Sequence, residues 1–371
     1  MEDRKKVLFL TNIPSPYRVD FFCEFAKYVD LTVLYELRAA TDRDDNWKSN
    51  VEALNFKEMY LKPVIKQASS AFCPEVKKYL SKQDYDCIIV GGYSTPTGMY
   101  AIRYMKKKHI PYILNCDGGF PATAENRFKR RLKSYMISGA KAYLSPGRFA
   151  DEYLVFYGAD SSKIRRYHFS SIHESDIVEP GFIDSKVYDK ERYTVISVGS
   201  FIKRKGFDIL IEASKNFVKS VDLKIVGGEP TEEYITLKKQ AEDVNQTLKI
   251  EFIPFKSKKE IFDLYKASDI FVLATREDIW GLVINEAMAC GLPVITTDRC
   301  GAGIELLTPN DITPVEDALA VASRVNKYLN NLEYMSESGI RNVERIECNT
   351  IENMASEHSD IVKWFAGIFV R

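Results

Sequence analysis

The stretch from 270 to 306 constrains the fold of this chain more than any other, because it reads as strand, loop, helix, strand and loop. Its first residues, 270–274, form a short apolar run of β-prone side chains, which is typical of a buried parallel strand. After an acidic break at 276–278, the apolar spacing predicts a short helix that Gly291 and Pro293 bring to an end. A second apolar strand follows. This alternation indicates an α/β fold, in which ligands bind where the carboxyl end of a strand feeds a helix.

The chemistry of that corner suits a diphosphate. Backbone N–H groups near Trp280, Gly281 and Leu282 would face a ligand at the helix N-terminus, and the helix dipole adds about 0.3–1 kcal/mol of preference for an anion. A glycine there lets a phosphate approach the backbone closely. Glu286 on the helix can accept hydrogen bonds from sugar hydroxyls, and Asp278 lies in the loop before the helix. Taken alone, two such acids would favour a strand–helix unit that binds no phosphate, but the sequence around this pair reverses that preference.

This segment resembles the donor-site signature of retaining glycosyltransferases of family 4, of the bacterial surface-polysaccharide type. That signature is Glu, seven residues, Glu, then Ala-Met-Ala-x-Gly-x-Pro-Val. Here the second acid is Glu286, and residues 287–294 follow the signature throughout. The first acid falls on Asp278, with Glu277 one place earlier. The resemblance therefore leaves open which of these two side chains faces the donor sugar.

A second corner begins at Tyr193, where the pattern is a strand, Gly199, a basic loop and a helix. It resembles the family element Gly-Arg-x-x-x-x-Lys-Gly, whose final pair matches Lys205 and Gly206. Ser200 replaces the arginine, and Lys203 or Arg204 can supply the missing charge. The resemblance implies donor binding by Gly199, Ser200, Arg204, Lys205, Glu277, Asp278, Trp280, Gly281, Leu282 and Glu286.

The first half of the chain is predicted to be a similar strand–helix series with a locally basic character. Between Met99 and Arg148 the only acids are Asp117 and Glu125, whereas basic residues are frequent, which favours an anionic surface or acceptor. In the family, a histidine is common at the end of the strand that this chain has before residue 116. Here Cys116 occupies the position of that histidine. Asp117 is then expected to contact a hydroxyl group in its place, the alternative being a helix cap.

Two further features of this half have open interpretations. Arg18 follows a proline-containing loop where family members often have glycines, and it is either an anion contact or a solvated arginine. Residues 126–136 form a basic amphipathic helix, with Phe128, Leu132, Tyr135 and Met136 on one face. Such a helix can lie on anionic lipid, or it can pack its apolar side on the sheet of its own domain.

Composition excludes several classes. Hydrophobic content of 45% and charged content of 28% are ordinary for a soluble globular chain, and no apolar stretch approaches a membrane span. No secretory signal is visible, and the seven dispersed cysteines fit reduced thiols in a cytoplasm. We expect no metal, no cofactor and no nucleic-acid partner. A dinucleotide-dependent oxidoreductase is disfavoured because no Gly-x-Gly-x-x-Gly follows the first strand.

The resemblance implies the α/β GT-B fold, with two Rossmann-like domains whose parallel sheets face each other across a cleft. The predicted acceptor-binding domain spans 1–178 and is followed by a linker at 179–192. The predicted nucleotide-sugar-binding domain spans 193–349. A last helix, 350–371, is expected to cross back to the first domain through Trp364, Phe365, Ile368 and Phe369.

The expected function is retaining transfer of a hexose from a UDP- or GDP-linked donor to a glycan or polyprenyl-linked glycan in surface polysaccharide biosynthesis. The expected location is the cytoplasm, with peripheral contact to an anionic membrane. Resemblance assigns the catalytic roles to Asp278, Glu286, Lys205 and Asp117. Two alternatives on the same scaffold are a sugar-nucleotide epimerase and a non-catalytic sugar-binding protein.

Overall fold

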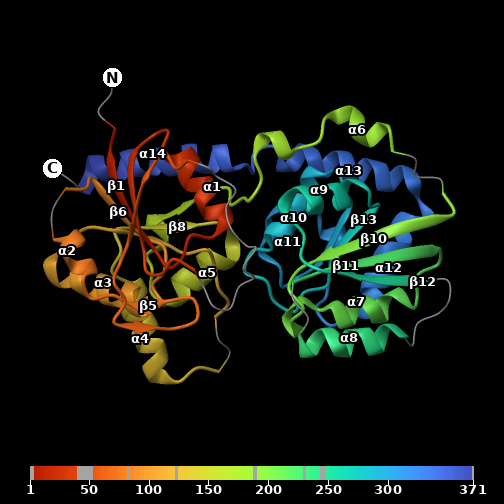
Figure 1. The fold of residues 1–371 in the computed structure, drawn as a ribbon, viewed down its shortest axis with the longest axis horizontal. Coiled ribbons are helices and arrows are strands. Elements are labelled where there is room, and N and C mark those ends of the chain that lie inside the picture. Colours follow the sequence, from red (N-terminus) through yellow and green to blue (C-terminus); the bar gives the residue numbers. More distant parts are fainter. Residues whose placement is uncertain are drawn as a thin grey trace. The chain divides into compact units, whose positions relative to one another are not determined.

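The computed structural model describes residues 4–39, 53–81, 84–121, 124–186, 190–228, 231–242 and 248–369. The chain divides into two compact units (Figure 1). Unit 1 comprises Met1–Phe169 and Ile351–Arg371, and unit 2 comprises Ser170–Thr350. Among the described residues, no helix combines the length and the apolar character needed to cross a bilayer.

Unit 1 is built on a parallel sheet with the strand order β3-β2-β1-β6-β7-β8-β9 among its described residues. The strands of this unit are β1 Lys6–Thr11, β2 Asp30–Tyr35, β3 Lys57–Tyr60, β4 Ile65–Lys66, β5 Ala71–Phe72, β6 Cys87–Val90, β7 Ile113–Asn115, β8 Ala142–Ser145 and β9 Ile164–Arg166. Its helices are α1 Pro16–Phe25, α2 Val76–Leu80, α3 Pro96–Lys108, α4 Arg127–Ile137, α5 Arg148–Phe156, the short η1 Ser161–Lys163, and α14 Ile351–Phe369. Strands β4 and β5 form a separate antiparallel pair.

The central strand β1 shows why this sheet forms. Residues 7–10 are apolar and fully buried, as expected for a strand with helices on both faces of its sheet. The ring of Phe9 meets Phe22 of α1 edge to face, with centroids 4.9 Å apart. Burying each such side chain stabilises the folded state by about 1.5–3 kcal/mol.

The C-terminal helix α14 belongs to unit 1 although it follows unit 2 in the sequence, as the predicted fold class requires. It lies alongside α1 (Figure 1). The ring centroid of His358 lies 4.7 Å from that of Phe21 and 5.9 Å from that of Phe25. Phe365 is fully buried, as expected. Ile368, however, is 55% exposed, so the prediction that it forms part of the docking face is wrong. The buried face turns toward positions 351, 354, 358, 362 and 365, at helical spacing.

Unit 2 is built on a second parallel sheet, with the order β12-β11-β10-β13-β14-β15. Its strands are β10 Arg192–Val198, β11 Ser220–Val226, β12 Leu248–Ile253, β13 Ile270–Leu273, β14 Val294–Thr297 and β15 Ile312–Thr313. Its helices are α6 Pro180–Asp184, α7 Phe207–Ser214, α8 Glu232–Glu242, α9 Lys258–Lys266, α10 Leu282–Ala289, α11 Gly301–Leu306, α12 Ala318–Asn330 and α13 Leu332–Ile346, with short 3₁₀ turns η2 Glu174–Asp176, η3 Lys203–Lys205 and η4 Pro309–Asp311.

The segment predicted as an interdomain linker belongs to unit 2, and its residues 187–189 lie outside the described residues. Its residues 180–184 form α6, in which Ile183 is buried against Val178 and Val343. The backbone N–H of Val178 donates to the carbonyl of Ala289 at 2.9 Å. The division between the units falls after Phe169, earlier in the chain than the predicted boundary at 178.

Candidate functional site

The strand order of unit 2 reverses between β10 and β13. Strands β11 and β12 extend the sheet on one side of β10, and β14 and β15 extend it on the other side of β13. In Figure 1, α7 and α8 lie on one side of this sheet, and α9 and α10 lie on the other. The loops that follow β10 and β13 therefore lie at the point where the strand order reverses, which is where open α/β sheets bind ligands.

These two loops, 199–206 and 274–281, are in direct contact. Gly206 has a φ of +68°, and a Cβ at this position would lie 1.8 Å from the carbonyl oxygen of Ala274. The carbonyl of Arg204 accepts hydrogen bonds from the N–H of Arg276 at 2.8 Å and from the hydroxyl of Thr275 at 2.9 Å. Only glycine allows this approach, so Gly206 brings the basic loop against the end of β13.

The basic loop pairs with the first acid of the motif. Lys205 Nζ donates to Asp278 Oδ2 at 2.5 Å, and Arg204 Nη1 lies 3.7 Å from Asp278 Oδ1. Glu277 instead points toward Arg299, at 3.4 Å, and its side chain is 46% exposed. The sequence left open which acid faces the donor side, and in the structure Asp278 is the acid that lies against the cationic loop.

The N-terminus of α10 completes this corner. Gly281 precedes the helix with a φ of +91°, and a Cβ there would lie 2.9 Å from Cys300 Sγ. The indole of Trp280 is buried and donates to Asn285 Oδ1 at 3.0 Å. Trp280 therefore supports the turn through its side chain, while the first-turn N–H groups near Leu282 offer the anion-binding end of the helix.

Glu286 lies on α10, where its carboxylate is half-buried. It accepts hydrogen bonds from Ser171 at 3.1 Å and from the hydroxyl of Tyr265 at 3.2 Å. Burial raises the pKa of Glu286, and the hydrogen bond from Ser171 and the positive charge of Lys258 oppose this rise. Two hydroxyl groups thus hold the carboxylate in one orientation.

Gly199 matches the glycine of the family motif, whereas Ser200 stands where the motif has an arginine and carries no charge. A Cβ at Gly199 would lie 3.3 Å from the stem of Lys205, so the glycine leaves room for that lysine. Ser200 is exposed, and its carbonyl accepts the N–H of Ile202 at 2.8 Å.

Asp117 follows β7 in unit 1 and is held by a buried arginine. Arg18 Nη2 donates to Asp117 Oδ1 at 2.5 Å, and Asn115 Nδ2 donates to the same oxygen at 2.8 Å. The side chain of Arg18 is 5% exposed, whereas that of Asp117 is 34% exposed. Arg18 is thus neither a solvated residue nor an exposed anion contact, because its side chain is buried and is paired with Asp117. Cys116, at the position of the family histidine, is buried, and this raises its pKa to about 12.

Rings surround the guanidinium of Arg18. Its Cζ lies between 5.6 and 5.9 Å from the ring centroids of Phe9, Tyr17 and Phe169. Burial is the largest single influence on the pKa of Arg18 and would lower it, but Asp117, Tyr17 and Tyr167 together raise this pKa. The arrangement fixes a carboxylate at the strand end, which is suited to binding a hydroxyl group.

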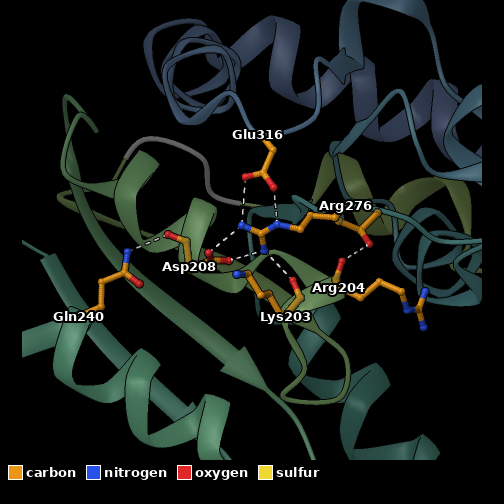
Figure 2. Close-up of polar contacts among 7 residues, drawn as sticks. Lys203, Arg204, Asp208, Gln240, Arg276 and Glu316 are labelled. Atoms are coloured by element: carbon orange, nitrogen blue, oxygen red, sulfur yellow. Dashed lines mark hydrogen bonds and ion pairs between the residues drawn. The ribbon is translucent and has the colours of Figure 1, made fainter. Parts of the chain in front are cut away.

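One residue of the loop 274–281 was not predicted from the sequence to have a role. Arg276 was interpreted only as part of an acidic break, yet its guanidinium contacts Asp208, Glu316 and the carbonyl of Lys203 (Figure 2). The signal that could have identified it is its place: it follows β13 closely, at the strand that borders the reversal of the sheet.

Comparisons with known proteins agree with this architecture. Residues 181–342 match the family model described as glycosyl transferases group 1. The chain is 23% identical over 318 residues to a probable sucrose-phosphate synthase of Thermosipho melanesiensis, which covers 79% of this chain and 73% of that protein.

Two solved structures share the fold. Anabaena Alr3699/HepE, determined in complex with UDP and glucose, has a TM-score of 0.75 at 16% identity, covering 98% of this chain and 100% of its own. WaaG, a glycosyltransferase involved in lipopolysaccharide biosynthesis, has a TM-score of 0.65 at 14% identity, covering 96% and 99%. At such identities the likeness concerns the fold.

The class follows from the fold and the family match together. Two Rossmann-like units with a returning C-terminal helix are the GT-B fold, which confirms the predicted fold class. The match of residues 181–342 to the group 1 glycosyl transferases, together with this fold, supports a glycosyltransferase.

Proposed function

We propose that the protein transfers a hexose from a UDP- or GDP-linked donor to a glycan or polyprenyl-linked glycan, with retention of anomeric configuration. The observation that carries this proposal is the contact between the cationic loop 203–205 and Asp278 beside the N-terminus of α10. Cations and helix N–H groups at a sheet reversal suit a diphosphate. Unit 2 is then the donor-binding unit, and unit 1 the acceptor-binding unit.

Each residue has a role in this proposal. Lys205 and the N-terminus of α10 stabilise the charge that develops on the departing diphosphate, which is usually the largest electrostatic contribution to such a reaction. Glu286 holds the ribose hydroxyls, and Asp278 orients Lys205 and contacts the transferred sugar. Because protein cations supply this charge, the proposed reaction requires no metal and no cofactor.

The acceptor is assigned to a residue of unit 1. Asp117 of unit 1, held by Arg18, is proposed to bind an acceptor hydroxyl group. The likeness to HepE, a complex with UDP and glucose, supports a nucleotide-sugar donor, and the likeness to WaaG supports surface polysaccharide biosynthesis.

Donor specificity can be tested by a thermal-shift screen against nucleotide sugars and free nucleotides, followed by product analysis. We expect one nucleoside diphosphate and its sugar conjugate to stabilise the protein, and a glycosylated acceptor to form with retention. Epimerisation of the donor without acceptor glycosylation would support the epimerase instead. Binding without turnover would support the sugar-binding protein.

We further propose that α4 brings the protein to an anionic membrane from the cytoplasmic side. The apolar residues Phe128, Leu132 and Tyr135 of α4 are 74%, 39% and 44% exposed, whereas Met136, predicted on the same face, is 6% exposed and belongs to the core of unit 1, so only the end of this face is packed. Four exposed basic residues accompany them: Arg127, Lys129, Arg130 and Arg131. Exposed rings flanked by cations are typical of helices that lie in the headgroup region of anionic bilayers.

This contact can be tested by co-sedimentation with vesicles of phosphatidylcholine, with and without phosphatidylglycerol. We expect the Phe128→Ser/Leu132→Ser variant to bind anionic vesicles at least about tenfold more weakly, since each apolar side chain buried contributes about 1.5–3 kcal/mol. Val64→Ser is the control, because Val64 is also exposed, at 69%, in unit 1 but outside α4. Equal binding of the double variant and the control would contradict the proposal.

A further inference from the structure

The guanidinium of Arg276 joins three parts of unit 2 that are distant in sequence (Figure 2). Nη1 and Nη2 each donate to Asp208, on the first turn of α7, at 2.8 Å. Nε donates to Glu316 Oε1, and Nη2 also donates to Glu316 Oε2 at 3.0 Å. Nη1 donates in addition to the carbonyl of Lys203 at 2.6 Å. The planar fork of arginine fits these bidentate contacts, which a lysine cannot reproduce.

The same residue holds the basic loop through its backbone. Arg276 N–H donates to the carbonyl of Arg204 at 2.8 Å, so consecutive carbonyls of the basic loop are both bound to Arg276. In return, Arg204 Nη1 donates to the carbonyl of Glu277 at 2.6 Å. With the loop carbonyls fixed, Lys205 extends to Asp278.

Arg276 also neutralises the carboxylates that lie beside the basic loop. Burial alone would raise the pKa of Asp208, but the hydrogen bonds from Arg276 lower it, so this carboxylate is charged and neutralised locally. Without Arg276, the carboxylates of Asp208 and Glu316 would be left without the cation that binds them both. Such carboxylates would attract the neighbouring lysines and compete with an anionic ligand.

Glu316 supplies a second, independent observation. Its φ is +64°, a left-handed conformation that is uncommon outside glycine. Such a backbone persists where its surroundings determine it, and strained residues gather at functional sites. Here the contacts with Arg276 hold the Glu316 side chain.

We infer that Arg276 is a positioning residue for donor binding, which fixes the 203–205 loop so that Lys205 is presented to the donor diphosphate. This inference rests on the proposed function, because the ligand is the donor named there. Arg276 itself does not contact the diphosphate in this account. Its effect on transfer passes through Lys205.

The test compares Arg276→Lys with a matched control, Arg192→Lys, in the full chain. Arg192 begins β10 and binds Asp222 at 2.9 Å and the carbonyl of Val221 at 3.4 Å. It therefore makes the same kinds of contact at the opposite end of the strand that leads into the basic loop. Both substitutions keep the positive charge and remove the arginine fork.

The first readout needs no ligand. Hydrogen exchange is measured over residues 199–207 of the free protein. We expect faster exchange of Lys205 and Gly206, whose N–H groups donate within the loop to Ile202 and Lys203, in Arg276→Lys but not in Arg192→Lys. Unchanged exchange in Arg276→Lys would overturn the inference.

The second readout is a double-mutant cycle on transfer. We expect Arg276→Lys to lower kcat/KM by on the order of 10- to 100-fold, through a lower kcat as well as a higher donor KM, because a displaced Lys205 would bind and stabilise the diphosphate less well. In a Lys205→Ala background the same substitution should cost less than about threefold. A full loss in that background would show that Arg276 does not act through Lys205.

These readouts separate the inference from the proposed function. A wild-type protein without turnover of any nucleotide sugar would overturn the proposed function, whereas the exchange measurement would still decide whether Arg276 anchors the loop.

Discussion

Both units place an ion pair after a strand of a parallel sheet, yet they differ in which charge stays exposed beside it. In unit 1 the cation is buried: Arg18 is 5% exposed and Asp117 is 34% exposed. In unit 2 Lys205 and Asp278 are similarly shielded, at 14% and 12%, and Arg204 is 45% exposed. Unit 1 therefore presents a carboxylate at its strand end, whereas unit 2 presents cations.

In the proposed function, this difference would let one strand order serve two kinds of ligand. Both sheets reverse their order beside the first strand of the unit, between β1 and β6 and between β10 and β13. A carboxylate suits a hydroxyl group, and lysine and arginine suit a diphosphate. In the proposed function, the charge that the loop presents, rather than the topology, would distinguish the acceptor site from the donor site.

Among the changes that test this comparison, Asp117→Asn should have the largest effect, on the free energy of unfolding. Arg18 would remain buried among three rings without a charged partner, which typically costs about 3–5 kcal/mol of unfolding free energy. Asp278→Asn should cost less than about 2 kcal/mol, because the flexible stem of Lys205 can carry its charge to water. Urea unfolding of both variants measures this, and equal losses would contradict the distinction drawn between the two pairs.

Lys205→Ala should have the next largest effect, on activity rather than stability. Removing a group that stabilises the departing diphosphate should lower kcat by about 10²- to 10³-fold. Glu286→Ala should also lower transfer strongly, through loss of the ribose contact. Steady-state kinetics and circular dichroism check both variants, and full activity in each of two folded variants would refute the site assignment.

His358 gives a pH-dependent prediction for the buried cluster of unit 1. Burial lowers the pKa of His358 to about 4, and the nearby Arg18 adds to this, against the hydrogen bond to the carbonyl of Met354. Between pH 6.5, its ordinary value, and pH 4, the unfolded chain binds a proton that the folded protein does not. Its contribution to stability should therefore fall by about 3 kcal/mol over this window as the pH falls.

Urea unfolding of His358→Phe across that pH range checks the prediction, since the variant should lose this part of the slope. His168 is the opposite case, because its hydrogen bond to Glu357 raises its pKa. His168 should stabilise the fold below its ordinary pKa and lose that contribution as the pH rises through the raised value. An unchanged slope in His358→Phe would contradict the assignment of a neutral, buried imidazole.

The smallest effect is expected for the surface pair of Arg192 and Asp222. Their side chains are 43% and 31% exposed, and such pairs typically contribute less than about 1 kcal/mol. Arg192→Gln should leave both unfolding and transfer nearly unchanged. A loss comparable to that of Asp117→Asn would mean that burial does not explain the difference between the two units.

Much of the fold could be predicted because local signals agreed with the tertiary structure. The helix predicted over 281–290 is α10, and Gly291 ends it with a φ of +69° before Pro293. Strand β3 and the β4–β5 pair were not predicted, since β3 is an edge strand whose first two residues are exposed and the pair is only two residues long on each side.

The site was predictable where a motif carries it and not where distant residues meet. Lys205, Asp278 and Gly281 belong to local patterns. The role of Arg276 depends on Asp208 and Glu316, which are 68 and 40 residues away. Arg18 likewise meets Asp117 across 99 residues, so neither its burial nor its partner could be inferred from its neighbours in sequence.

The most direct test of the central claim is calorimetric titration of the wild type and Lys205→Ala with UDP and with GDP. We predict that one of the two nucleotides binds the wild type and that Lys205→Ala binds it at least about tenfold more weakly, since a charge-assisted contact contributes about 1.5–3 kcal/mol. Binding of equal strength in both proteins, or no binding of either nucleotide, would contradict the placing of the donor diphosphate at the cationic loop of unit 2.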